Sequence, residues 1–382
     1  MASFGNVYMN GTTHTYDDAT SDEESVLHRI AQINQRRRVT FPNKRTIERR
    51  KPRRWPLVFR FIKGAIHTHI AIPVVLHALF TTIIVCLDLY VDVRATLPPA
   101  IVPSLSIVVG LMLVFRNQTS YARFWDGRNN LTTIVTATRN LTRSFLCTSY
   151  KAGEDATETE RADIERTVRV LMAIPSSVKN SLRAEWGAAW APITKQDVNR
   201  VSGAITPRLN PDYAQLLPLG LKGHEEEGLA LPIELTALVE GFIKRGHDRG
   251  WFHAPGSSQL TVQLNTLVDA YGRMETIRYT SYPVAIMIHQ RQVLALFGAV
   301  LPLAIVEESH WWSIPIVGLV MFTLYGIEAT ACQLEDPFGY DRNDIKMDAI
   351  VEDARTEISV MLSEWRSCNQ GPIKKQMFME EI

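Results

Sequence analysis

The sequence has little of what a secreted, disulfide-stabilised or zinc-binding protein needs. Its 382 residues contain only four cysteines, and no two of them form a Cys-x-x-Cys pair: Cys86, Cys147, Cys332 and Cys368. Such wide spacing indicates neither a disulfide framework nor a zinc site, and it favours a reducing, cytosol-facing protein. The N-terminus, MASFGNVYMN, has no basic stretch followed by an apolar core. We therefore expect no cleaved secretory signal, so insertion into a membrane would use an internal segment.

Catalytic motifs and excess charge are also missing. The chain has 41 Lys and Arg against 40 Asp and Glu, and the formal net charge of +1 gives no general attraction to nucleic acid. The phosphate-binding loop, the His-Glu-x-x-His metalloprotease motif and the Gly-x-Ser-x-Gly elbow do not occur. His67 and His69 lie on different faces of a helix, so they are not expected to share a metal. We expect neither an enzyme nor a nucleic-acid partner.

Long apolar segments are what the sequence does have. A helix of about 20 residues crosses a hydrocarbon core of ~30 Å. Four segments are long enough: 65–90, 97–115, 283–306 and 311–334. Trp311 and Trp312 are expected to anchor the last one at the membrane interface. Glu328 lies inside it and should face protein or water, more readily as a helix-packing partner than as part of an ion pathway.

The charges around these segments predict an orientation. Residues 36–63 form a basic run in which Glu48 is the only acid, whereas the connections 88–96 and 307–310 are mainly acidic. Buried core helices of a soluble protein would explain the apolar segments but not this asymmetry. By the positive-inside rule, two hairpins enter from the cytosol and both termini stay there. The basic run fixes this topology and adds contact with anionic lipid headgroups.

The fold class expected is all-α: four transmembrane helices in two hairpins, with a helical cytosolic domain. No alternating strand pattern is found, and the polar middle predicts helices at 129–149, 158–180, 231–245 and 257–282, with loops over 187–230. The chain divides into a flexible cytosolic segment 1–43, a basic juxtamembrane segment 44–64, a first transmembrane hairpin 65–116, a cytosolic domain 117–282, a second transmembrane hairpin 283–334 and a cytosolic C-terminal segment 335–382.

Two motifs give the chain a family likeness. FRNQTSYARFWDGRNNL, residues 115–131, follows the second apolar segment, and QLEDPFGYDRND, residues 333–344, follows the fourth. With two hairpins around a polar middle, they resemble the bestrophins over residues 60–340. The Trp-Asp-Gly-Arg sequence is more similar to microbial and fungal members of the family than to animal ones. The resemblance implies a homopentamer with one axial pore for chloride and other small anions.

The resemblance also indicates a pore neck. Ile107, Leu111 and Phe115 recur at i, i+4 and i+8 and therefore share a helix face. They match the hydrophobic neck of the family, although animal members have an aromatic residue at the position of Leu111. Stacked apolar rings form a constriction that can empty of water, and Phe115 can offer an anion the electropositive edge of its ring. Without the resemblance, ordinary helix packing explains the stripe better.

Three arginines flank the neck: Arg116, Arg123 and Arg128. Repeated around a ring, they would raise the local anion concentration. The alternative is that they snorkel and form salt bridges between helices. For Arg123 and Arg128 we favour this helix-locking role.

Calcium is the one candidate cofactor. In animal bestrophins an acidic cluster after Pro-Phe-Gly binds calcium, and Asp341 and Asp344 match its coordinating carboxylates. Other residues replace the acids around them, and Arg342 adds a positive charge, whereas calcium prefers roughly 6–8 oxygen ligands and a negative site. The alternative, that the two acids cap and pin the helix that follows, has at least equal weight.

The leading hypothesis is a gated pentameric anion channel whose partners are its own copies, membrane lipids and small anions. One rival is a membrane transporter or enzyme built on the same helices, which would need ionisable groups converging at membrane depth. Another is a non-conducting scaffold of the same architecture. The plasma membrane is the favoured location.

Overall fold

The computed structural model describes most of the chain from residue 67 onward. The chain separates into two units, 1–63 and 64–382, and only the second contains described residues. These are residues 67–91, 97–149, 157–184, 212, 216–218, 221, 224, 227–341 and 343–370, without the side chains of 67–69 and 368–370. The predicted segments 1–43 and 44–64 lie outside them, and so does Arg342.

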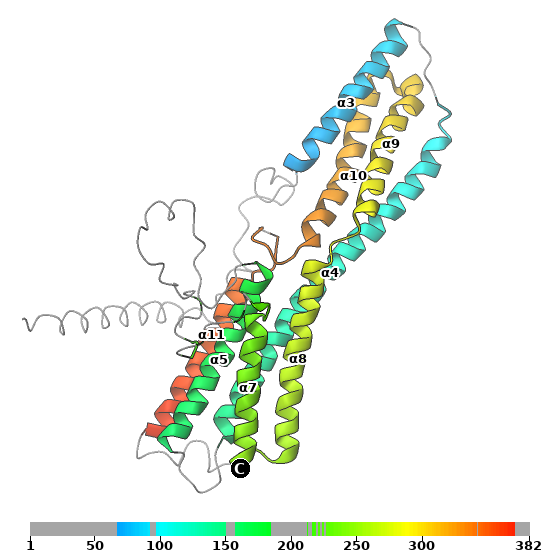
Figure 1. Ribbon diagram of the computed structural model, residues 1–382. Helices are drawn as coiled ribbons and strands as arrows, with labels where there is room; N and C mark the ends of the chain where they lie inside the picture. The colour runs from blue at the N-terminus through cyan, green and yellow to red at the C-terminus, as the bar shows by residue number, and fades with distance from the viewer. Residues whose placement is uncertain are drawn as a thin grey trace, which may run out of the picture. The chain divides into compact units, whose positions relative to one another are not determined.

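All regular structure in the described residues is helical (Figure 1). The helices are α3 His67–Tyr90, α4 Ile101–Thr148, α5 Glu158–Leu182, α7 Leu231–Asp248, α8 Ala254–Tyr279, α9 Val284–Ser309, the short 3-10 helix η3 His310–Trp312, α10 Ser313–Glu335 and α11 Met347–Gln370. The helices predicted at 158–180, 231–245 and 257–282 correspond to α5, α7 and α8. The expectation of an all-α chain is confirmed for the residues that the structure describes.

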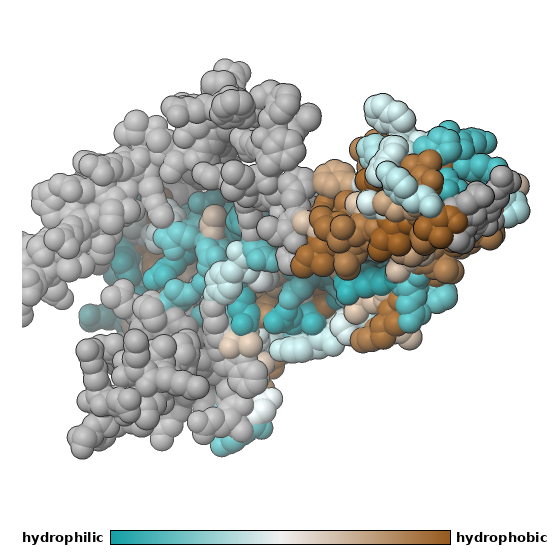
Figure 2. Space-filling view, turned by 90° about the horizontal axis from the view of Figure 1, so that it is seen from above, coloured by the Kyte–Doolittle hydropathy of each residue, from teal (hydrophilic) through white to brown (hydrophobic). Residues whose placement is uncertain are grey.

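Helices α3, α9, α10 and the first half of α4 form an apolar bundle (Figure 1). Its core joins Leu113 of α4, Phe297 of α9 and Met321 of α10, all buried. Large hydrophobic side chains also gather on its outside, at the right of Figure 2. By length and composition, three helical stretches can cross a membrane: Ile70–Tyr90, Ile101–Thr148 and Val284–Glu335. The third contains both α9 and α10, so a count of four crossings stays a prediction.

The two chain reversals of the bundle meet at one end. His310 has a positive φ of 42°, which turns the chain sharply between α9 and η3. Its Nδ1 lies 3.7 Å from Oδ2 of Asp88, near the end of α3. The amide of Leu97, just before α4, donates to the carbonyl of Leu303 in α9 at 3.0 Å. The described ends of the two connections predicted to share one side of a membrane are therefore close in space.

The second half of α4 packs with α5, α7, α8 and α11 around a separate core. Three aromatic rings form its centre: the centroid of Phe145 lies 4.8 Å from that of Phe242 and 6.2 Å from that of Phe252. Local signals fix several helix starts in this part. Thr157 and Glu160 form a capping box at the start of α5, and α7 and α8 each have proline in their first turn.

Helix α4 corrects one expectation. The sequence predicted a transmembrane segment over 97–115 and a separate helix over 129–149, but α4 runs unbroken for 48 residues. The polar residues between them do not end the helix, because the intervening segment has no proline and its one glycine, Gly127, is buried in the helix. The boundary at residue 116 thus falls inside a helix, and one helix belongs to both cores.

Gly246 gives a test of the second core. A Cβ atom there would lie 2.8 Å from Cδ2 of Phe252 and closer still to Cε2. We expect Gly246→Ala to destabilise the protein by about 1–3 kcal/mol through overpacking. Gly272→Ala in α8 is the matched control, since nothing lies within 4 Å of its added Cβ. Thermal unfolding in detergent should give a lower midpoint for the first variant only, and equal midpoints would contradict this packing.

Candidate functional site

The predicted neck residues lie on the face of α4 that the other described helices leave uncovered. Ile107, Leu111 and Phe115 are 70%, 54% and 60% exposed, whereas Val109 and Leu113 of the same helix are buried. Helix α4 therefore has a packed face and an open face, and the structure brings the three side chains together on the open one. Whether this face lines a pore stays a prediction.

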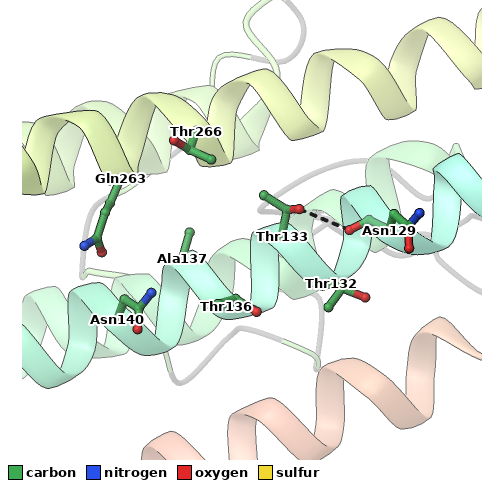
Figure 3. A pocket seen from close by; sticks show the side chains of 8 residues that line it. All are labelled: Asn129, Thr132, Thr133, Thr136, Ala137, Asn140, Gln263 and Thr266. Atoms are coloured by element: carbon green, nitrogen blue, oxygen red, sulfur yellow. Dashed lines mark hydrogen bonds between the residues drawn. The ribbon is translucent and has the colours of Figure 1, made fainter.

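Further along α4 the open face changes from apolar to polar. Helical geometry places five polar residues within roughly 100° of the neck stripe around the helix axis. With Ala137 of α4 and with Gln263 and Thr266 of α8, they line a groove of about 400 Å³ (Figure 3): Asn129, Thr132, Thr133, Thr136 and Asn140. In Figure 3 the amides of Asn140 and Gln263 lie on facing sides of this groove.

Arg116 lies on the packed face, one residue after the neck. It is 1% exposed, and its Nη2 donates to Oε2 of Glu335 at 2.7 Å. Its guanidinium also lies 4.1 Å from the ring centroid of Tyr282. Glu335 in turn accepts from the amide of Tyr282 at 3.1 Å. These contacts join α4 to the end of α10 and to the start of α9, so Arg116 locks helices together.

Arg123 continues this junction, and Arg128 does not. Nη2 of Arg123 donates to the carbonyl of Ile277 at 2.6 Å, and its Nε donates to the carbonyl of Glu335 at 3.3 Å. Both bonds hold α4 against other parts of the chain, which is the helix-locking role expected for Arg123 from the sequence. Among the described residues, the guanidinium of Arg128 bonds to Thr132 of its own helix, at the polar groove. Of the three arginines, Arg128 is therefore the one placed beside the open face.

The two motifs that carried the family likeness contact each other. Phe338 lies against Gly127, where an added Cβ would meet its ring at 3.0 Å, so a larger residue at this position would force the ring to shift. Arg183, after α5, donates from Nε to the carbonyl of Phe338 at 3.1 Å and lies 4.1 Å above the ring of Tyr340. The loop after α10 is thereby fixed against both α4 and α5.

Glu328 is buried between α9 and α10, as the helix-packing reading expected. It is 4% exposed and accepts from Nε2 of Gln290 at 2.8 Å. Nε of Arg291 lies 3.7 Å from its other oxygen. A paired carboxylate in this position holds the two helices together rather than offering a free ionisable group.

The residues proposed for calcium serve the loop itself. Asp344 is 6% exposed, and its Oδ2 accepts from the amide of Asp341 at 2.7 Å. Burial raises the pKa of Asp344, and the negative charges of Asp341 and Asp336 raise it further. Asp336 pairs with Arg278. In the described part of the chain, which excludes Arg342, no three His, Cys, Asp or Glu side chains are grouped to hold a metal. The contacts that the structure describes are those of loop pinning, and calcium binding by Asp341 and Asp344 stays a prediction.

Fold and site together define an all-helical integral membrane protein with a helix open along one face. The sequence matches the family described as "Bacterial/Fungal Bestrophin protein" over residues 46–360. The chain belongs to the bestrophin family, as its two motifs indicated.

Relatives and solved structures agree with this assignment. A voltage-dependent anion channel-forming protein of Nostoc sp. is 32% identical over 303 residues, covering 79% of this chain and 90% of that protein. One of Synechocystis sp. is 29% identical over 326 residues, covering 84% and 97%. A crystal structure of a variant bacterial bestrophin homologue from Klebsiella pneumoniae shares the fold, with a TM-score of 0.60 and 24% identity over 76% of this chain and 98% of that one. The Nostoc and Synechocystis relatives are named as channels, not as enzymes.

Sequence reasoning missed the polar half of the open face and the partners of Arg116. The signal for the first was present, because the 3.6-residue period returns the face of Ile107 at Thr132, Thr136 and Asn140 once α4 is taken as continuous. Glu335 lies 219 residues from Arg116 in the sequence, and no local pattern pairs them.

Arg116 and Arg128 form a matched pair for a stability test. Arg116→Gln leaves Glu335 without its cation, and breaking such a buried pair costs about 3–5 kcal/mol. Arg128→Gln removes an arginine whose bond within the described residues is to its own helix, and should change stability by no more than about 0.5 kcal/mol. Thermal unfolding of the purified protein should separate the two variants clearly. Similar midpoints would show that Arg116 does not hold the junction.

Asp344 tests loop pinning against calcium binding. Because its folded pKa is raised, its stabilising contribution is present at low pH and is lost as pH rises through that pKa. At neutral pH, Asp344→Asn keeps an acceptor without the charge and should unfold no earlier than wild type, while Asp344→Ala should unfold earlier. Unfolding is measured in calcium and in chelator. A calcium-dependent rise in wild type that Asp344→Asn abolishes would identify a calcium site.

Proposed function

We propose that the protein is a homopentameric anion channel with four transmembrane helices in two hairpins and a pore lined by α4. The observation that carries this proposal is the open face of α4. Ile107, Leu111 and Phe115 are largely exposed there, although the opposite face of the same helix is packed into the core of the bundle.

A ring of copies explains this open face. The apolar bundle of one chain has a packed interior, in which Val109, Leu294 and Val317 are buried, so its own helices enclose no pathway. A symmetric ring brings the same face of every copy to a common axis. The names of the Nostoc and Synechocystis relatives support an anion as the permeating species.

The neck then acts on the hydration of the ion. Five copies of Ile107, Leu111 and Phe115 would form three stacked apolar rings, which hinder strongly hydrated ions and empty of water when narrow. Weakly hydrated anions cross at a lower cost. The positive edges of the Phe115 rings favour anions over cations.

The positions of the charged groups support an orientation with both termini in the cytosol. Asp88 and His310 mark the end of the bundle where the short acidic connections lie. Arg116 and Arg123 lie toward its other end, next to the second core. The positive-inside rule assigns that second end to the cytosol. The plasma membrane remains the favoured location.

The geometry supports the two alternative functions, a membrane transporter or enzyme and a non-conducting scaffold, less well than it supports a channel. A transporter or enzyme would need free ionisable groups converging at membrane depth, whereas both oxygens of Glu328 have partners, Gln290 and Arg291. A non-conducting scaffold would show the same fold, and only a flux measurement separates it from a channel.

The neck assignment predicts a change of flux without loss of assembly. Replacing Ile107, Leu111 and Phe115 together with Ala widens the rings, so chloride flux into liposomes should rise several-fold, or its selectivity should change, while the oligomer survives. The matched control replaces Ile72, Leu76 and Ile83, which are equally exposed on α3. Unchanged flux and selectivity in the α4 variant would remove the neck assignment, and no flux from wild type would favour the scaffold.

A further inference from the structure

We propose that the polar groove between α4 and α8 binds partly dehydrated monovalent anions, and that it sets their order of permeability together with the neck. The inference rests on the proposed role of α4 as the pore-lining helix. It assigns a ligand to the polar half of the open face, for which the neck hypothesis gives no function.

The first argument is the position of the groove. Thr132, Thr136 and Asn140 lie on the same face of the same unbroken helix as the neck residues. The helix rise places Thr136 about 30 Å beyond Phe115 along the axis. If the neck residues face a pore, these polar side chains face its continuation.

The second argument is the supply of free donors. The hydroxyls of Thr132, Thr133 and Thr266 donate to carbonyls of their own helices. In contrast, no described residue is bonded to the hydroxyl of Thr136 or to the side-chain amide of Asn140. The hydroxyl of Thr136 and the side-chain amide of Asn140 can therefore donate hydrogen bonds to a ligand.

Gln263 adds a donor from the opposite wall. Its Oε1 is buried and has no partner among the described residues. The amide can therefore turn its NH2 group into the groove without breaking a bond. In Figure 3 this side chain extends from α8 toward α4, next to Ala137 and Asn140. Donors thus reach the groove from both helices.

The third argument is charge. The lining residues include no acid, and the guanidinium of Arg128 bonds Thr132 at the end of the groove nearer the neck. Neutral donors near one arginine attract an anion without holding it as tightly as an ion pair does. Passage requires binding strong enough for entry and weak enough for release. This chemistry fits chloride, bromide, iodide or nitrate.

The test compares chloride and iodide in planar bilayers. Thr136→Val with Asn140→Leu removes two donors per subunit at nearly constant size. Chloride, the more strongly hydrated ion, loses more than iodide does. We therefore expect a lower chloride conductance and an iodide-to-chloride permeability ratio raised by roughly three- to tenfold. Asn140→Asp adds a ring of negative charge and should also reduce chloride conductance, less so at high salt.

Two controls separate the groove from general damage. Thr148→Val is the same substitution at an exposed site of α4, roughly 120° around the axis from Thr136. Thr136→Ser retains the hydroxyl. Both should behave as wild type. Chloride binding is measured independently, as the broadening of the ³⁵Cl magnetic resonance line by the purified oligomer, and the double variant should lose part of it.

The outcomes distinguish this inference from the proposed function. Suppose that wild type conducts and that the double variant matches it in conductance, permeability ratio and ³⁵Cl broadening. The groove is then not an anion site, but the protein is still an anion channel. If wild type does not conduct, the proposed function and the role of the groove in permeation fail. The broadening then decides: a loss in the double variant supports the binding site, and no loss overturns it.

Discussion

The buried guanidinium of Arg116 is the contact on which the arrangement of the helices depends. Removing a charge from water costs several kcal/mol unless a partner compensates it. Glu335 supplies the opposite charge and Tyr282 supplies an aromatic face, so the end of α10 and the start of α9 must meet α4 at this residue. The same contact fixes the rotation of α4. Arg116 points inward, and Phe115, which lies about 100° away around the helix, is exposed on the open face.

The open face of α4 is apolar in its first half and polar in its second half, and this difference connects the structure with the proposed function. Its first half carries Ile107, Leu111 and Phe115, which offer no hydrogen bond to an ion and favour those that lose water easily. Its second half carries hydroxyl and amide groups that can replace some of that water. The two halves are separated by the junction that fixes α4 against the rest of the chain. The proposed selectivity thus arises from the order of side chains along a single helix, not from a separate domain.

Much of the fold was predictable because long apolar segments and 3.6-residue periodicity are local signals. They predicted the bundle helices, α5, α7 and α8 within a few residues. The continuity of α4 was missed because its polar residues after Phe115 resemble the end of a membrane segment, although nothing there breaks a helix. The neck stripe was found by spacing, whereas the pairing of Arg116 with Glu335 depends on tertiary packing across 219 residues. The bond between Asp341 and Asp344 explains why acids matching a metal motif need not bind one.

The unbroken length of α4 has a mechanical consequence. A helix of 48 residues is about 70 Å long and resists bending, so its two halves do not tilt independently. If α4 moved as a rigid rod about the junction at Arg116, a tilt of the longer polar half would move the shorter apolar half in the opposite direction. Such a lever would link the width of the apolar rings to events far outside the membrane.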